Sequence, residues 1–310
     1  MNISHHLYKR SSSDAFLRHL QEECTFYKGL SDKDSIMTKK VQLFEELYTM
    51  LSEINRICDK HGIKYFAMGG SAIGAIYDKG ILPWDDDIDI GMTRDNYNKF
   101  LQVAPKELSA DYFLSWMESD PNTPFFYAKL KKHGTLFIEE HFKDVNMHQG
   151  IFIDIFPYDK AHRKKWVQHI QFKGAEFLKC CLMGKSIWLW KHCGKCQIER
   201  PWQRAWISCF ATRVANTIFS KKLIYKMIVA IQSWCNSQSH TSYKLINTFV
   251  DYISQDQIAT LTYHPFGSSQ IMGPADMKDY MKKFRRYTDE EAAQKGGHTP
   301  YILSLNAHKP

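Results

Sequence analysis

The chain has 310 residues, of which 44% are hydrophobic and 24% charged, a composition typical of a globular protein with a substantial core. Residues 1–30 are broken by charges and lack the apolar stretch of a secretory signal, and no later segment offers the run of about 20 apolar residues that a membrane span needs. The net charge is +8. Because we find neither an export signal nor a span, we expect a cytoplasmic protein whose eight cysteines stay reduced.

The first half of the chain alternates between helical and strand patterns. Apolar residues recur at helical spacing from about Lys39 to Lys60, and Gly62 marks the end of this predicted helix. A strand is predicted at Ile63–Met68 and a helix of small residues at Ser71–Lys79. The elements that follow are a strand at Asp87–Met92, a helix near Arg94–Val103, and strands at Tyr112–Met117, Phe125–Leu130, Thr135–Ile138 and Ile151–Phe156.

After Pro157 the pattern becomes helical to about Ala259, and an irregular section follows from Pro265, with a helix near Ala275–Arg285. The order predicts an α+β fold, with a mixed β-sheet core flanked by helices and a helical second half. We expect an N-terminal lead at 1–38, a catalytic domain at 39–160 and a mostly helical basic region at 161–310 that packs on it.

The helical half is strongly basic. Between residues 160 and 235 there are 15 Lys or Arg against two acids, and six of the eight tryptophans lie in the same window. One interpretation is a surface that faces an anionic partner, such as a membrane or a phosphorylated substrate. The other is a helical subdomain with solvated lysines and core tryptophans. Cys193 and Cys196 have zinc-knuckle spacing, but the sequence offers no second pair of ligands nearby.

Two carboxylates are interleaved with isoleucines in Asp87-Ile88-Asp89-Ile90. Because a strand alternates its faces, the two aspartates point to one side and the isoleucines point into the core. Neighbouring carboxylates repel each other unless a cation or a proton intervenes, and Mg²⁺ commonly takes one or two carboxylates together with substrate phosphates. The alternative, an acidic turn that caps the next helix, suits only the preceding Asp85 and Asp86.

A third carboxylate, Asp154, stands alone inside the apolar strand Ile151–Phe156. A buried charge is costly unless it is matched. An ordinary ion pair with a lysine is one explanation, and a shared metal site with Asp87 and Asp89 is the one we favour, because phosphoryl transfer uses such groups to hold metal and orient the attacking oxygen.

A strand is predicted to turn into a helix at Gly69-Gly70-Ser71. Glycines there allow close approach of a ligand to the backbone, and the N–H groups at a helix start attract phosphate. A plain tight turn is the alternative.

Together these motifs resemble the LicD family, which belongs with the polymerase-beta-like nucleotidyltransferases. The resemblance is carried by Gly69-Gly70-Ser71, Gly74, Gly80, Pro83–Asp89, Gly91-Met92, Lys129-Leu130-Lys131, Thr135, Gly150–Pro157 and Asp159. It implies a nucleotidyltransferase-like core and transfer of phosphocholine, or a similar phospho-linked group, from a CDP-linked donor to a cell-surface glycan or lipid-linked glycan.

The resemblance also implies roles for individual residues. Asp87, Asp89 and Asp154 would bind Mg²⁺, with Mn²⁺ as the alternative ion. Gly69, Gly70 and Ser71 would contact the donor phosphates, and Lys129 would neutralise phosphate charge unless it is a solvated strand lysine.

Other classes compete with this interpretation. A metal-dependent glycosyltransferase also carries an Asp-x-Asp motif, but it normally lacks a Gly-Gly-Ser helix start just upstream. An inactive scaffold relative would not need all three carboxylates. Nucleic-acid binding explains the basic half but not the inward carboxylates, so we expect no nucleic-acid partner. A peripheral contact with the anionic inner face of a membrane remains a hypothesis for the basic half.

Overall fold

A computed structural model describes residues 33–139, 142–186, 214–215, 217–237, 242–244, 252–282 and 302–305. Its helices are α3 (Lys33–His61), α4 (Gly69–Tyr77), α5 (Arg94–Glu107), α6 (Lys165–Ser186), α8 (Lys221–Ser233), α9 (Gln255–Ala259) and α10 (Met277–Met281). Its strands are β1 (Phe66–Ala67), β2 (Asp89–Thr93), β3 (Tyr112–Ser115), β4 (Ala128–Lys132), β5 (Leu136–Ile138), β6 (Phe152–Lys160), β7 (Ser242–Lys244), β8 (Tyr252–Ser254), β9 (Leu261–Phe266), β10 (Ser269–Pro274) and β11 (Ile302–Ser304).

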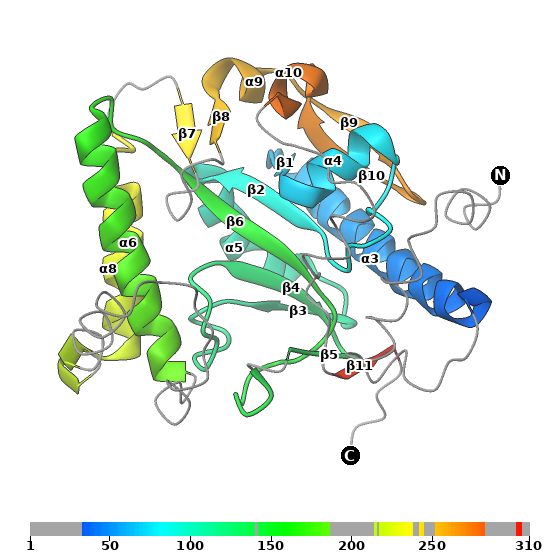
Figure 1. Cartoon of the computed structure of the whole chain (residues 1–310), viewed down its shortest axis with the longest axis horizontal. Coiled ribbons are helices and arrows are strands. Elements are labelled where there is room, and N and C mark those ends of the chain that lie inside the picture. Colours follow the sequence, from blue (N-terminus) through cyan, green and yellow to red (C-terminus); the bar gives the residue numbers. More distant parts are fainter. Residues whose placement is uncertain are drawn as a thin grey trace.

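The centre of the molecule is a mixed sheet with the strand order β1-β2-β6-β4-β3 (Figure 1). Strands β2 and β6 run parallel, whereas β1, β4 and β3 are antiparallel to their neighbours. Two short strands, β7 and β8, extend the sheet beside the end of β6. The expected mixed sheet flanked by helices is therefore confirmed.

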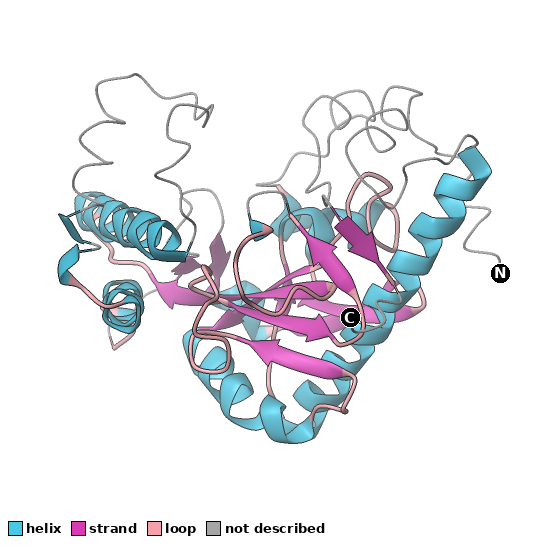
Figure 2. Cartoon of the chain, turned by 90° about the horizontal axis from the view of Figure 1, so that it is seen from below, coloured by secondary structure: helices cyan, strands magenta, loops and turns pink. Residues whose placement is uncertain are grey.

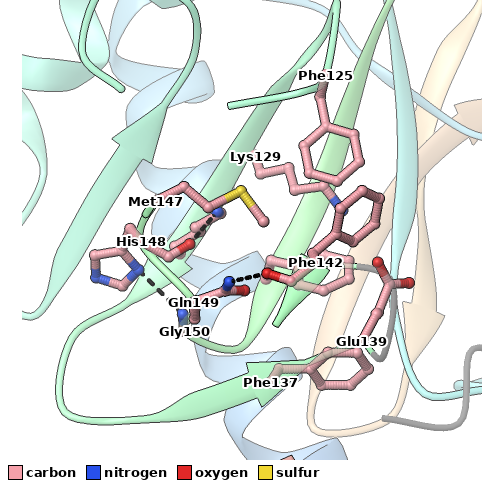
Figure 3. Close-up of a pocket in the computed structure, with 11 residues that line it drawn as sticks. Phe125, Lys129, Phe137, Glu139, Phe142, Met147, His148, Gln149 and Gly150 are labelled. Atoms are coloured by element: carbon pink, nitrogen blue, oxygen red, sulfur yellow. Dashed lines mark hydrogen bonds between the residues drawn. The ribbon is translucent and has the colours of Figure 1, made fainter. Parts of the chain in front are cut away.

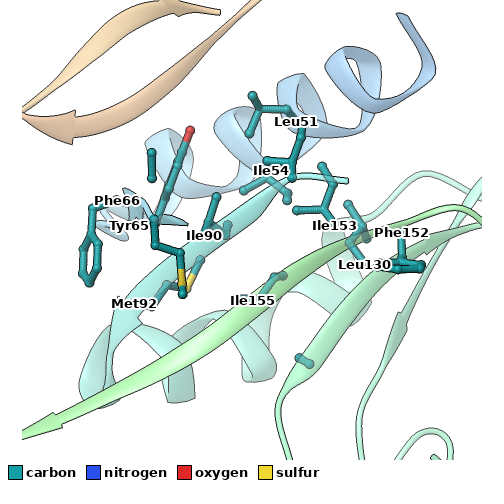
Figure 4. Close-up of a cluster of buried hydrophobic side chains, with 14 of the residues drawn as sticks. Leu51, Ile54, Tyr65, Phe66, Ile90, Met92, Leu130, Phe152, Ile153 and Ile155 are labelled. Carbon is teal, nitrogen blue, oxygen red and sulfur yellow. The ribbon is translucent and has the colours of Figure 1, made fainter. Parts of the chain in front are cut away.

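Helix α3 forms because its apolar residues repeat at helical spacing, and it ends where Gly62 adopts φ +61°, as predicted. Its buried face, with Leu51 and Ile54, packs against sheet residues such as Ile90 and Ile153 (Figure 4). Isoleucines 88, 90, 153 and 155 are all fully buried. Because strands alternate their faces, the aspartates between these isoleucines lie on the side of the sheet away from α3.

The predicted helical stretch from Pro157 to about Ala259 is interrupted by strands, so that prediction was wrong in part. Strand β6 does not stop before Pro157 but continues to Lys160, and β7 and β8 lie within the stretch expected to be helical. Proline is tolerated in β6 because β4 begins with Ala128, opposite Ile155, which leaves Pro157 paired with Met92 of β2 alone. A two-residue turn at Gly267, with φ +60°, joins β9 and β10 into a hairpin that contacts α3.

Helices α6 and α8 pack side by side at one end of the molecule, on the left in Figures 1 and 2. Buried Arg94, at the start of α5, links this pair to the sheet, because it binds Asp159 of β6 and Gln232 of α8. The cysteine pair Cys193 and Cys196 lies outside the described residues. Among the described helices, none has both the length and the apolar character of a membrane span.

Candidate metal and phosphate site

Three of the predicted site residues lie in one row across three adjacent strands. Asp89 of β2 is the register partner of Asp154 in β6, and Asp154 is in turn the partner of Lys129 in β4. The backbone N–H of Asp154 also donates to the carbonyl of Ile88, at 2.9 Å. Parallel pairing on one side and antiparallel pairing on the other thus bring residues from three distant segments to the same level of the sheet.

Asp87 adds a third carboxylate beside this row. It lies two residues before Asp89, in the extended segment that leads into β2, and each of Asp87, Asp89 and Asp154 offers an oxygen within 4.8 Å of the others. Asp87 and Asp154 are each 5% exposed. Burial raises the pKa of Asp154, Lys129 opposes that rise and Asp87 adds to it. Such crowded carboxylate oxygens fit a hard divalent cation, so the residues present suit the Mg²⁺ that the motifs imply.

Asp154 also forms the lysine ion pair that the sequence left open as its alternative. The Nζ atom of Lys129 lies 2.8 Å from Oδ1 and 3.1 Å from Oδ2 of Asp154. The Asp154 carboxylate lies on the same face as Asp87 and Asp89, as expected, but the lysine ion pair that competed with the metal site is also formed, so metal binding by Asp154 stays a prediction. Lys129 is 3% exposed, so the alternative of a solvated strand lysine is wrong.

The glycines at the start of α4 lie against the same cluster. Gly69 adopts φ +52°, and a Cβ there would lie 3.7 Å from Asp89 Oδ2. A Cβ at Gly70 would lie 2.3 Å from Asp85 Oδ2, so only glycine fits without a shift of that carboxylate. The Ser71 hydroxyl oxygen accepts the backbone N–H of Asp89 at 2.8 Å. Ser71 therefore joins the helix start to the first residue of β2, a role that the sequence did not indicate.

Asp85 and Asp86 do not cap a helix, so that interpretation of them was wrong. The next helix, α5, has Thr93 as its N-cap, and the carboxylates of Asp85, Asp86 and Asp87 form a second group of neighbouring oxygens. Burial, followed by the charge of Asp87, raises the pKa of Asp85. The acidic turn is thus folded inward toward the site.

Two residues near the site were missed by sequence reasoning. Lys40 of α3 is buried, donates to the Pro83 carbonyl, and has its pKa lowered to about 8 by burial, against the opposing charges of Asp86 and Asp85. The Tyr127 hydroxyl interacts with Asp154, and burial raises its pKa well above the ordinary value, so it remains a donor. The one available signal was that Tyr127 stands two residues before Lys129, on the same side of an extended segment.

An aromatic hollow borders Lys129 (Figure 3). The Lys129 ammonium lies 3.4 Å from the ring centre of Phe152 and 4.3 Å from that of Phe125, close enough for cation–π attraction. Phe137, Phe142, Glu139 and Met147 complete much of the wall. These rings hold the lysine head group in place while leaving it against Asp154.

Comparison with known proteins gives a consistent picture. The family described as LicD/FKTN/FKRP, nucleotidyltransferase domain, matches residues 62–182. The chain is 31% identical over 145 residues to the lipopolysaccharide cholinephosphotransferase LicD of Haemophilus influenzae, an alignment that covers 41% of this chain and 52% of that protein. It is 35% identical over 84 residues to an uncharacterized protein of Rickettsia typhi, covering 26% of each chain. The chain therefore spans about half the length of the first relative and about a quarter of the second.

Proposed function

Since residues 62–182 make this chain a member of the LicD family, we propose that it is a Mg²⁺-dependent transferase that moves phosphocholine, or a similar phospho-linked group, from a CDP-activated donor to a cell-surface glycan. The observation that carries the proposal is the row of Asp87, Asp89 and Asp154, whose carboxylate oxygens lie within 4.8 Å of one another beside the start of α4.

The three aspartates would hold the metal, with Mn²⁺ as an alternative to Mg²⁺. When bound, the ion would neutralise phosphate oxygens and help to align the attacking and leaving groups. The protein's own part is to hold the carboxylates in position. The Ser71 hydroxyl fixes the backbone of Asp89, the Tyr127 hydroxyl interacts with Asp154, and Lys129 lies against Asp154 from the other side.

The donor's phosphates are proposed to bind at the start of α4. There Gly69 and Gly70 carry no side chain that would block approach to the backbone, and the first N–H groups of the helix favour negative charge. Lys129 supplies a further positive charge at the far side of the carboxylate row, where it would balance phosphate charge. The glycan acceptor is proposed from the name of the Haemophilus influenzae relative, a lipopolysaccharide cholinephosphotransferase.

The test is a transfer assay with purified protein, radiolabelled CDP-choline, Mg²⁺ and a lipopolysaccharide acceptor. CDP-ribitol, CDP-glycerol and nucleotide sugars serve as competing donors. We expect the wild type to release CMP and label the acceptor, and both products should require the divalent ion. Asp87→Asn should form neither product. Turnover of nucleotide sugars without turnover of any CDP-linked donor would instead identify a glycosyltransferase and overturn the proposal.

A further inference from the structure

The helix pair α6 and α8 carries far more positive charge than the rest of the described chain. From Arg163 to Lys185 and along α8 there are nine Lys or Arg against a single acid, Glu176, a balance of +8. Glu176 is itself paired with Lys173 at 2.8 Å. None of the site residues lies on these helices, so the charge is not explained by the proposed reaction.

Large apolar side chains are exposed on the same two helices. Along α6, Trp166, Ile170 and Phe177 follow helical spacing and are 63%, 52% and 36% exposed. Along α8 and just beyond its end, Leu223 and Trp234 are 43% and 55% exposed. The opposite sides are buried, with Ile224 and Ile228 of α8 in the core. Each helix therefore buries one apolar face in the core and exposes a second apolar face on the side away from it.

The two exposed tryptophans lie at the same end of the helix pair. The N–H of Lys160, before α6, donates to Asn236, after α8, and the Gln171 side chain donates to the carbonyls of Ile231 and Gln232. The helices are therefore antiparallel, with the start of α6 beside the end of α8. Trp166 and Trp234 fall within this shared end, next to exposed Arg163, Lys164 and Lys165.

We propose that the outer face of α6 and α8 binds the surface of an anionic lipid bilayer. Lysine and arginine attract anionic headgroups, and tryptophan prefers the boundary between headgroups and acyl chains, so the two kinds of residue together suit this partner. A second copy of the chain would bring two faces of like charge together. A nucleic acid would use the charge but would leave Ile170, Phe177 and Leu223 without a role.

This inference is independent of the transferase proposal, because binding is measured without turnover. The two are linked through Lys179 of α6, whose Nζ lies 5.7 Å from the ring centre of Phe126, just before the strand that carries Lys129.

The test is sedimentation of the full chain with vesicles of phosphatidylcholine alone or mixed with phosphatidylglycerol. We expect binding to the mixed vesicles at low salt and release at high salt, because screening shortens the reach of surface charge. The pair Lys164→Glu and Lys165→Glu should lower the bound-to-free ratio about tenfold or more. Lys106→Glu with Lys278→Glu, two exposed lysines on α5 and α10, is the matched control and should change it little.

A second variant, Trp166→Ser with Trp234→Ser, keeps the charge and should still weaken binding. The proposal is overturned if the protein binds both kinds of vesicle equally. It is also overturned if the control pair weakens binding as much as the Lys164 and Lys165 pair, or if the tryptophan pair leaves binding unchanged. The proposal also fails if the protein forms a concentration-dependent dimer, or binds duplex DNA, and the same tryptophan or lysine variants abolish that association. Circular dichroism and the unfolding midpoint of each variant establish that a loss of binding is not a loss of fold.

Discussion

Lys129 and Asp154 face each other as register partners on β4 and β6, with Nζ 2.8 Å from Oδ1, and both are almost fully buried. Removing one partner leaves the other charge buried without its match. Lys129→Met should therefore lower the free energy of unfolding by about 3 kcal/mol or more. The double variant Lys129→Met with Asp154→Asn should lose less than the sum of the two single variants.

Urea unfolding of the four proteins, with Mg²⁺ chelated, gives this cycle directly. If the stability losses of the single variants add exactly in the double variant, the two side chains are not coupled. The ion pair would then make no contribution to the stability of the site.

Asp87→Asn and Asp89→Asn should each abolish Mg²⁺-dependent transfer while leaving the fold intact. Because each replacement removes one of several repelling carboxylates, the metal-free protein should be no less stable than the wild type. Thermal unfolding with and without Mg²⁺ measures this, and the rise in midpoint on adding Mg²⁺ should disappear in both variants. Asp111→Asn, an exposed aspartate before β3, is the control. Retention of more than a few per cent of activity would contradict the metal assignment.

Glycine substitutions separate backbone strain from crowding of the site. Gly69 and Gly134 both have positive φ, but a Cβ at Gly134 meets nothing within 4 Å. Gly134→Ala should cost about 1 kcal/mol of stability with no change in activity. Gly70→Ala, whose Cβ would lie 2.3 Å from Asp85 Oδ2, should raise the KM for the donor.

Unfolding curves and steady-state kinetics on each glycine variant test both statements. A Gly70→Ala enzyme with wild-type KM and kcat would show that this helix start does not approach the donor.

His148 should make stability fall at mildly acidic pH. Its Nδ1 accepts the backbone N–H of Gly150 at 3.1 Å, so that atom must stay unprotonated. Burial, helped by the charges of Lys131 and His133 and opposed by Asp120, lowers the pKa of His148 from 6.5 to about 4. Between those values the unfolded chain binds a proton that the folded chain does not, so the contribution of this histidine to stability is complete above about pH 6.5 and is lost toward pH 4.

The measurement is urea unfolding from pH 7.5 down to pH 4. His148→Asn, whose side-chain oxygen can still accept from Gly150, should show a shallower decline than the wild type. His169→Asn, on an exposed position of α6, should follow the wild-type curve. Identical pH slopes for His148→Asn and the wild type would refute this role.

What the sequence alone determined was local and periodic. The isoleucines at 88, 90, 153 and 155 predicted which side of each strand is buried, and hence that Asp87, Asp89 and Asp154 share the other side. Apolar spacing and Gly62 predicted α3 and its end. These signals work because a strand repeats every two residues and a helix every 3.6. The spacing of apolar residues along the chain therefore shows which face of each element is buried.

Only the tertiary structure decided which residues meet across the sheet. The pairing of Lys129 with Asp154, the bond from Asp89 to Ser71 and the inward position of Asp85 depend on strand register and on contacts between distant segments. The continuation of β6 through Pro157 likewise depended on where β4 begins. No local pattern encodes such register, because it is set by how whole strands and helices bury their apolar faces together.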